Sequence, residues 1–175
     1  MSADAPVYSV DASALIEMKN VYRFEIVGFR PMWHFIGHLG DEGRVRVVEQ
    51  ARNECHDRVL DDWFALHPAM VMPMSEELNE YVIALNAELE AASLPMVDPE
   101  STENRADPFV VALALMIEER PRTNLRGQGQ RCCHVISYEG DTMRRGLARI
   151  GRVCREYRLG CLRWPDMLQR EGWTG

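Results

Sequence analysis

Long apolar runs and export features are what this sequence of 175 residues has least of. No stretch reaches the roughly 18 apolar positions that a membrane span requires, so we expect no membrane contact. The first residues lack the basic and apolar regions of a signal peptide. The cysteines number five, an odd count that makes reduced thiols the default. Together these absences predict a cytoplasmic protein.

Several kinds of site are disfavoured because their sequence patterns are missing. A zinc knuckle needs paired ligands a few residues apart, and Cys132, Cys133 and His134 are too contiguous for that. A flavodoxin-like nucleotide binder needs a glycine-rich phosphate loop after its first strand, and none follows residues 7–10. A phosphatase of the HAD type needs Asp-x-Asp directly after its first strand, but here Ser13 replaces the second Asp of that motif.

Lysine is nearly absent, because Lys19 is the only one among 20 basic residues. The charge is also uneven: residues 1–119 carry a formal charge of −14 and residues 120–163 carry +8, within a total of −7. The planar guanidinium of arginine suits phosphate and carboxylate partners. The arginine-rich last third is therefore a candidate surface for an anionic partner.

Short β-prone runs alternate with longer helical patterns along the whole chain. The expected strands are 7–10, 44–48, 69–72, 133–137 and 159–163. The expected helices are 12–18, 28–39, 50–67, 75–92, 107–117 and 164–170. This alternation predicts one α/β domain over residues 1–175, with a central, mainly parallel sheet of four to five short strands covered on both faces.

Acidic residues follow two of the expected strands, where parallel sheets bind their ligands. Asp11 comes directly after the first strand, and Glu139 and Asp141 follow the run 133–137. Asp107 opens a helix that is apolar almost all round, with Pro108 at the first helical position. Helix capping explains Asp11 or Asp107 alone, and a solvated turn explains Glu139 alone. The combination predicts a carboxylate cluster.

Glu54 is a weaker candidate on its own. It lies on the expected helix 50–67, away from the apolar face and in line with Asp57 and Asp61. A solvated acidic stripe accounts for that pattern, and periodicity cannot select Glu54 from its neighbours.

The order of these acids resembles that of the PIN-like nucleases, which include the VapC-type toxins. Their first motif, an apolar strand followed by Asp-x-Ser, is similar to residues 8–16 around Asp11. Their third motif, an Asp that opens a small apolar helix, is similar to the start at Asp107, and their fourth to the strand ending before Glu139, which replaces the commoner Asp. The helical Glu of the second motif matches Glu54 best, with Glu49 as the fallback.

A narrower resemblance covers nearly the whole chain. Residues 16–22 contain an Ile-Glu-x-Lys segment and a Tyr, and an aromatic-rich helix begins near residue 28. These features, with the Trp-Pro-Asp-Met-Leu segment at residues 164–168, resemble an uncharacterised branch of PIN-like proteins. The resemblance implies a three-layer α/β/α fold of the PIN-like type.

The family implies a metal-dependent endoribonuclease, often the toxin of a toxin–antitoxin pair. Carboxylates suit Mg²⁺ or Mn²⁺, which prefer oxygen ligands. On this resemblance Asp11 and Asp107 hold the first ion, while Glu54 and Glu139 act through water or hold a second, with Asp141 as a further ligand. Ser13 hydrogen-bonds a carboxylate or a metal-bound water.

Partners remain open on the sequence alone. Arg145, Arg149 and Arg152 share one face if their segment is helical, and could contact single-stranded or structured RNA, an acidic antitoxin, or only solvent. The aromatic helix around Phe29, Trp33 and Phe35 is a candidate for a homodimer contact, and core burial explains it equally well. Two other functions stay open: a PIN-like binding module without catalysis, and a different carboxylate-metal phosphohydrolase.

Overall fold

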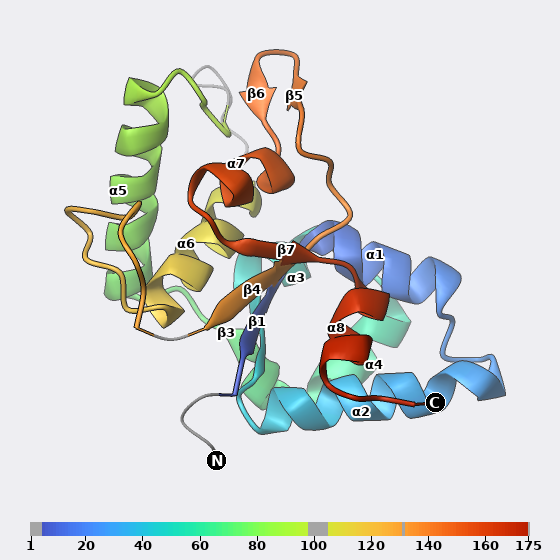
Figure 1. Ribbon diagram of the computed structural model, residues 1–175. Helices are drawn as coiled ribbons and strands as arrows, with labels where there is room; N and C mark the ends of the chain where they lie inside the picture. The colour runs from blue at the N-terminus through green and yellow to red at the C-terminus, as the bar shows by residue number, and fades with distance from the viewer. Residues whose placement is uncertain (1–4, 98–104, 131, 175) are drawn as a thin grey trace.

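A five-stranded parallel sheet lies at the centre of the computed structural model, which describes residues 5–97, 105–130 and 132–174 (Figure 1). The strand order is β3-β2-β1-β4-β7, and every neighbouring pair is parallel. The strands are β1 (Val7–Val10), β2 (Val45–Val48), β3 (Val71–Met72), β4 (Cys133–Ile136) and β7 (Gly160–Leu162). The predicted α/β class and all five predicted strands are confirmed.

Helices cover both faces of the central strands, and the largely apolar sequences of these strands suit that burial. All four residues of β4 are buried, as are three of the four in β1. Strands buried on both faces read as continuous apolar runs rather than alternating ones. The register aligns Val10 of β1 with Val47 of β2 and Ile136 of β4, so these strands end at the same edge of the sheet.

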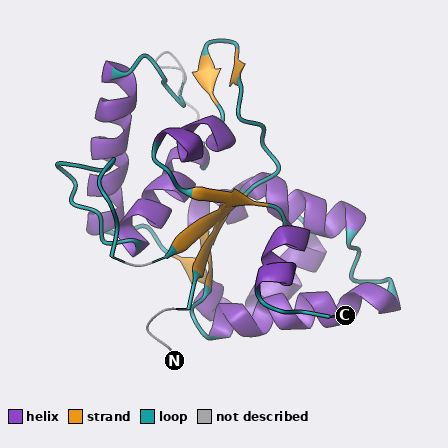
Figure 2. Cartoon of the chain, in the orientation of Figure 1, coloured by secondary structure: helices purple, strands orange, loops and turns teal. Residues whose placement is uncertain are grey.

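Helices form a layer on each face of the sheet (Figure 2). One layer contains α1 (Ala12–Val21), α2 (Arg30–Asp41), α4 (Arg58–Leu66) and α8 (Trp164–Arg170). The other contains α5 (Glu76–Ala91), α6 (Asp107–Ile117) and α7 (Ile150–Glu156). The short α3 (Glu49–Glu54) follows β2 and touches both α1 and α6, and short 3₁₀ helices span Val27–Phe29 and Pro68–Met70.

The innermost helix is α6, which packs on β1, β2 and β4. Its residues from Pro108 to Leu115 are all buried. The Ser9 hydroxyl of β1 donates to the Val110 carbonyl at 2.8 Å, so even the polar atom in this contact is satisfied. The apolar run predicted to be a buried helix is thus the centre of its layer. No helix in the described ranges is long and apolar enough to cross a membrane.

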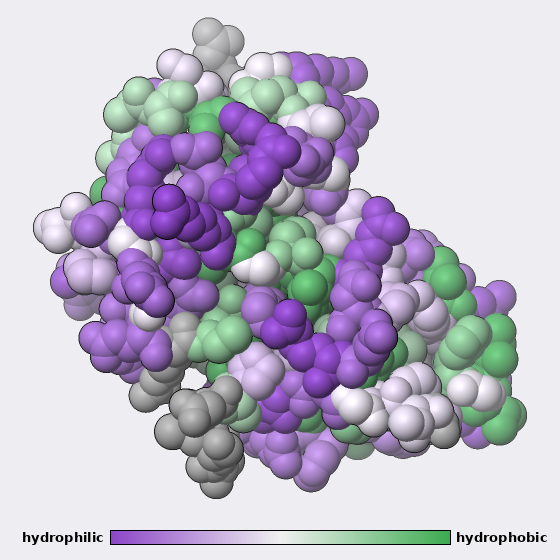
Figure 3. Space-filling model, in the orientation of Figure 1, coloured by the Kyte–Doolittle hydropathy of each residue, from purple (hydrophilic) through white to green (hydrophobic). Residues whose placement is uncertain are grey.

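The aromatic helix α2 faces the core rather than presenting its tryptophan to a partner. Trp33 is fully buried, and its ring meets that of Trp63 edge to face at 5.1 Å. Part of the exposed apolar surface lies beside this helix, where α1 runs into α2, and includes Val21, Ile26 and Val27 (Figure 3). Trp33 is therefore unavailable for the homodimer contact considered from the sequence, whereas Phe29 and Phe35 are partly exposed and that contact stays a prediction.

The helix predicted over 50–67 is wrong as one element, because the chain forms α3 and α4 with a break at residues 55–57. Asp57 causes the new start: its carboxylate accepts from the Val59 and Leu60 amides at 2.9 and 3.4 Å. It also pairs with Lys19 at 2.7 Å. An N-cap residue lies outside helical geometry, so capping and a continuous helix exclude each other. Glu54 and Asp61 therefore belong to different helices.

The shared helical face expected for Arg145, Arg149 and Arg152 does not exist. Residues 143–148 form an antiparallel hairpin of β5 (Met143–Arg144) and β6 (Leu147–Ala148), and α7 begins only at Ile150. Arg145 lies in the hairpin turn, Arg149 precedes α7, and Arg152 is inside it. The turn has φ of +50° at Arg145 and +81° at Gly146, which no α-helix contains.

The helix break generates a stability prediction. Asp57→Ala should lower the free energy of unfolding by about 1 kcal/mol, because the first amides of α4 lose their cap. Urea unfolding measures the change. Asp62→Ala is the matched control on the same helix, since its exposed pair with Arg58 at 3.8 Å contributes little. An unchanged or increased stability of Asp57→Ala would indicate the continuous helix instead, because alanine favours a helix interior.

Candidate functional site

The candidate site lies where the strand order of the sheet reverses. From β1, the chain continues to β2 on one side, while β4 and β7 lie on the other. Open parallel sheets bind ligands at such a switch point, beyond the carboxyl ends of the strands. Asp11 follows β1 directly and Ser137 follows β4, so both predicted motifs reach this position.

Asp11 is the most buried acid of the site, with 2% of its surface exposed. Its Oδ2 accepts hydrogen bonds from the Ser13 amide at 3.2 Å, from the Ser13 hydroxyl, and from the Ser137 hydroxyl at 2.9 Å. Burial raises its pKa to about 6, the serine bonds oppose that rise, and the charge of Glu139 adds to it. Asp11 also caps α1, so the capping role and the site role coincide in one residue.

Two serine hydroxyls connect Asp11 to the end of β4. Ser13 Oγ accepts from the Tyr138 amide at 2.9 Å, and Ser137 Oγ accepts from the Glu139 amide at 3.0 Å. The expected supporting role of Ser13 is therefore seen in its hydrogen bonds to a carboxylate. Ser137 is not among the residues predicted for the site, although it stands at the strand end that resembles the fourth motif. These bonds fix the backbone that carries Glu139.

Asp107 is not the cap of α6, which corrects the prediction from the sequence. The N-cap residue is Ala106, and Asp107 is the first residue of the helix. Burial raises the pKa of Asp107 to about 7, helped by the charges of Glu139, Asp11 and Glu54, while Arg105 lowers it. The four predicted acids therefore lie close enough to interact electrostatically. Capping does not explain why an acid stands at this buried position.

Glu54 joins the site through α3. Its Oε1 accepts from the Ala106 amide at 2.7 Å, at the residue that precedes Asp107. This contact connects the end of α3 to the start of α6. Glu49 lies at the other end of α3, and both glutamates are exposed. The hydrogen bond to the Ala106 amide, and not burial, therefore favours Glu54 over Glu49 as the second acid.

Glu139 and Asp141 differ in their surroundings although they are two residues apart. Glu139 is partly buried, and its Oε2 accepts from the Ile150 amide at the start of α7 at 3.1 Å. Asp141 is exposed and pairs with Arg155 at 2.6 Å. Asp141 is therefore engaged at the surface, and we remove it from the expected set of metal ligands.

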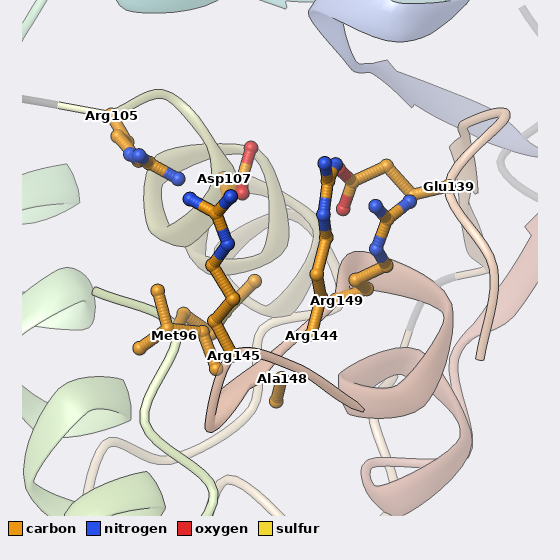
Figure 4. A pocket seen from close by; sticks show the side chains of 9 residues that line it. Met96, Arg105, Asp107, Glu139, Arg144, Arg145, Ala148 and Arg149 are labelled. Carbon is orange, nitrogen blue, oxygen red and sulfur yellow. The ribbon is translucent and has the colours of Figure 1, made fainter. Parts of the chain in front are cut away.

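A cavity of about 360 Å³ opens at the site and contains both acids and arginines (Figure 4). Asp107 and Glu139 lie on one side, and the side chains of the arginines extend towards them. The arginines come from the end of the loop before α6, from the hairpin and from the residue before α7: Arg105, Arg144, Arg145 and Arg149. Two of the three arginines singled out from the sequence thus line the cavity, whereas Arg152 is not among its lining residues.

The donor set fits a hard divalent cation. Two carboxylates at the site, those of Asp11 and Asp107, have raised pKa values because of burial and mutual repulsion. A nearby cation would relieve both effects. In the described part of the chain no group of three or more His, Cys, Asp or Glu side chains is arranged to hold a metal ion. Mg²⁺ commonly binds through only one or two carboxylates and keeps several waters.

These pKa values generate a pH prediction for the metal-free protein. The pKa of Asp107 rises from 3.8 in a free carboxyl to about 7 in the fold, so the folded state binds its proton more tightly. The free energy of unfolding should therefore fall as pH rises from about 4 to about 7. Asp107→Asn removes the buried charge and should stabilise the protein at about pH 8 by on the order of 2 kcal/mol.

Urea unfolding in EDTA at about pH 4 and pH 8 checks this expectation. The parent and Asp107→Asn should converge at the lower pH, where the carboxyl of Asp107 is protonated in the folded state. Asp61→Asn, at an exposed acid of α4, is the matched control and should not change the pH dependence. A parent that gains stability between pH 4 and 7 through Asp107 would contradict the raised pKa.

A protein-family model described as "Domain of unknown function (DUF4411)" matches residues 8–175. No curated protein and no solved structure matches the chain. The family match extends from β1, which precedes Asp11, to the end of the chain beyond α8, and so includes every residue of the candidate site. The chain therefore belongs to the DUF4411 family.

Proposed function

We propose that this protein is a metal-dependent endoribonuclease of the PIN-like type, which hydrolyses RNA phosphodiester bonds at Asp11, Glu54, Asp107 and Glu139. One observation carries the proposal: carboxylates with raised pKa values lie at the switch point of a parallel sheet, beside a cavity lined by arginines. Perturbed carboxylates in a cleft are common in active sites. The arginines suit a phosphate substrate.

Asp11 and Asp107 would hold the divalent ion. A bound Mg²⁺ or Mn²⁺ stabilises charge on phosphoryl oxygens and lowers the pKa of a bound water. The serine hydroxyls keep Asp11 in one orientation, which preserves the position of its oxygens without metal. Such hydrogen bonds to a ligating carboxylate support metal affinity.

Glu139 and Glu54 would contribute to positioning. The Ile150 amide occupies Oε2 of Glu139, which leaves Oε1 to accept a hydrogen bond from the attacking water. Glu54 fixes the start of α6 through the Ala106 amide and thereby sets the place of Asp107. The cavity arginines balance the charge of the polyanion in a protein whose net charge is −7.

The proposal is tested by cleavage of a mixed single-stranded RNA pool in EDTA, Mg²⁺ or Mn²⁺. The parent should cleave only with metal, and Asp11→Asn should lower the rate on the order of 100-fold or more, because a metal ligand is lost. Asp141→Asn is the matched control, since that acid is exposed and paired with Arg155. It should retain cleavage.

The melting temperature gives a second measurement on the same proteins. Metal should raise it in the parent and not in Asp11→Asn, because the ion binds only the folded site. Absence of cleavage in every metal, with equal metal-induced stabilisation of the parent and Asp11→Asn, would sink the nuclease proposal. It would favour a binding module without catalysis.

The hydrogen bond of Glu54 generates a separate prediction. Glu54→Gln keeps an oxygen for the Ala106 amide but removes the charge, and it should lower the cleavage rate roughly 10- to 100-fold. Glu49→Gln, on the same helix, should stay within about twofold of the parent. Steady-state cleavage rates decide between them. A larger loss in Glu49→Gln would exchange the roles of the two glutamates.

A further inference from the structure

The β5–β6 hairpin contributes residues to the cavity, and the roles proposed for the carboxylates do not account for them. It lies in the connection between β4 and α7 and projects away from the central sheet (Figure 1). Arg144, Arg145, Leu147 and Ala148 of this hairpin line the cavity. Four of the six residues from 143 to 148 thus line the cavity, although β5 and β6 form a separate two-stranded sheet.

The turn of this hairpin has an unusual residue at its first position. Arg145 and Gly146 both have positive φ, at +50° and +81°, between the paired residues Arg144 and Leu147. Two-residue hairpin turns with positive φ at both positions strongly favour Asn-Gly or Asp-Gly. An arginine there is strained relative to asparagine. Strained backbone positions cluster at functional sites, so the arginine side chain itself calls for an explanation.

The charges of the hairpin arginines are not used inside the protein. Four described arginines of the basic segment 120–163 pair with carboxylates, among them Arg120 with Glu118, Arg126 with Glu156, and Arg155 with Asp141. Among the described residues, neither Arg144 nor Arg145 is within ion-pair distance of a carboxylate. Their guanidinium groups are therefore available to an anion that enters the cavity.

The position of Arg145 indicates which anion. Its side chain extends from the hairpin tip into the cavity, on the side of Asp107 (Figure 4). The scissile phosphate of the proposed reaction must lie against the carboxylates and their metal. An arginine that reaches the cavity from the hairpin, outside the elements that carry the carboxylates, is suited to another phosphate of the same strand, because a nucleic-acid backbone carries one negative charge per nucleotide.

We propose that Arg145, aided by Arg144, forms a subsite for the RNA phosphate next to the scissile one. This inference rests on the proposed nuclease function and specifies its substrate: a strand with at least one phosphate beyond the bond that is cut. The strained turn is the structural device that directs the Arg145 side chain into the cavity. The hairpin arginines thus act as substrate-positioning residues.

The first test measures binding without cleavage. A fluorescently labelled RNA hexanucleotide is titrated in EDTA at several salt concentrations, and anisotropy gives the dissociation constant. Arg145→Asn should weaken binding about fivefold and reduce the log–log salt slope by about 0.7, the value for one single-strand phosphate contact. Its melting temperature should not fall, because Asn-Gly suits the turn.

Arg158→Asn is the matched control. Arg158 is also an exposed arginine with positive φ, at +56°, and lies outside the cavity lining. Its affinity and salt slope should stay within about twofold of the parent. Equal affinity of the parent and Arg145→Asn, or equal losses in the two variants, would overturn the subsite.

The second test uses substrate length. Cleavage of a dinucleoside monophosphate, which has only the scissile phosphate, is compared with that of a trinucleoside diphosphate. Arg145→Asn should lose most of the parent's preference for the longer substrate, so that its rates on the two substrates become similar. An equal loss on both would place Arg145 at the scissile phosphate and overturn the assignment.

The two tests separate this inference from the nuclease proposal. A parent that cuts RNA while Arg145→Asn binds and cuts normally keeps the nuclease function and loses the subsite. A parent that cuts nothing loses the nuclease function, and the binding difference between Arg145→Asn and Arg158→Asn then decides alone whether Arg145 contacts an RNA phosphate.

Discussion

Burial of the Asp11 carboxylate between the ends of β1 and β4 is the constraint on which the rest of the site depends. Parallel pairing of the two strands brings Asp11 beside Ser137, and the hydroxyls of Ser13 and Ser137 satisfy one carboxylate oxygen. The same hydroxyls accept the amides that follow β4 and so position Glu139. A carboxylate without these partners would be far more costly at 2% exposure, because a buried charge needs hydrogen bonds or an opposite charge.

The next acid of the site, Asp107, comes from α6, which is buried from Pro108 to Leu115. Because α6 is apolar almost throughout and packs on three strands, its first residue is held rigidly at the edge of the sheet. Asp107 occupies that place without serving as the cap, and Glu54 binds the amide before it. The core therefore supplies the precision of the site, while burial and the charges of neighbouring acids raise the pKa values of Asp11 and Asp107. Such conflicts between stability and local arrangement are typical of functional sites.

Charge is divided spatially as well as along the sequence. The acids come from β1, α3, α6 and the end of β4, which are parts of the sheet-and-helix framework. The cavity arginines come largely from the hairpin and its flank, which lie outside the central sheet. A framework that holds the carboxylates and an added hairpin that supplies positive charge together form one cavity for an anionic ligand. Four other described arginines of the basic segment form ion pairs within the fold: Arg120, Arg122, Arg126 and Arg155.

The sequence by itself determined the α/β class, the five strands, the buried helix and the acids Asp11, Asp107 and Glu139, because apolar periodicity and strand ends are local features. Only the tertiary structure decided which polar groups meet. It brings Glu54 to the Ala106 amide, Ser137 to Asp11, and Asp141 to Arg155. It also broke the helix at Asp57, whose cap and ion pair with Lys19 outweigh the apolar periodicity. Hydrogen bonds and ion pairs between distant segments depend on how the elements pack, which periodicity along the chain does not encode.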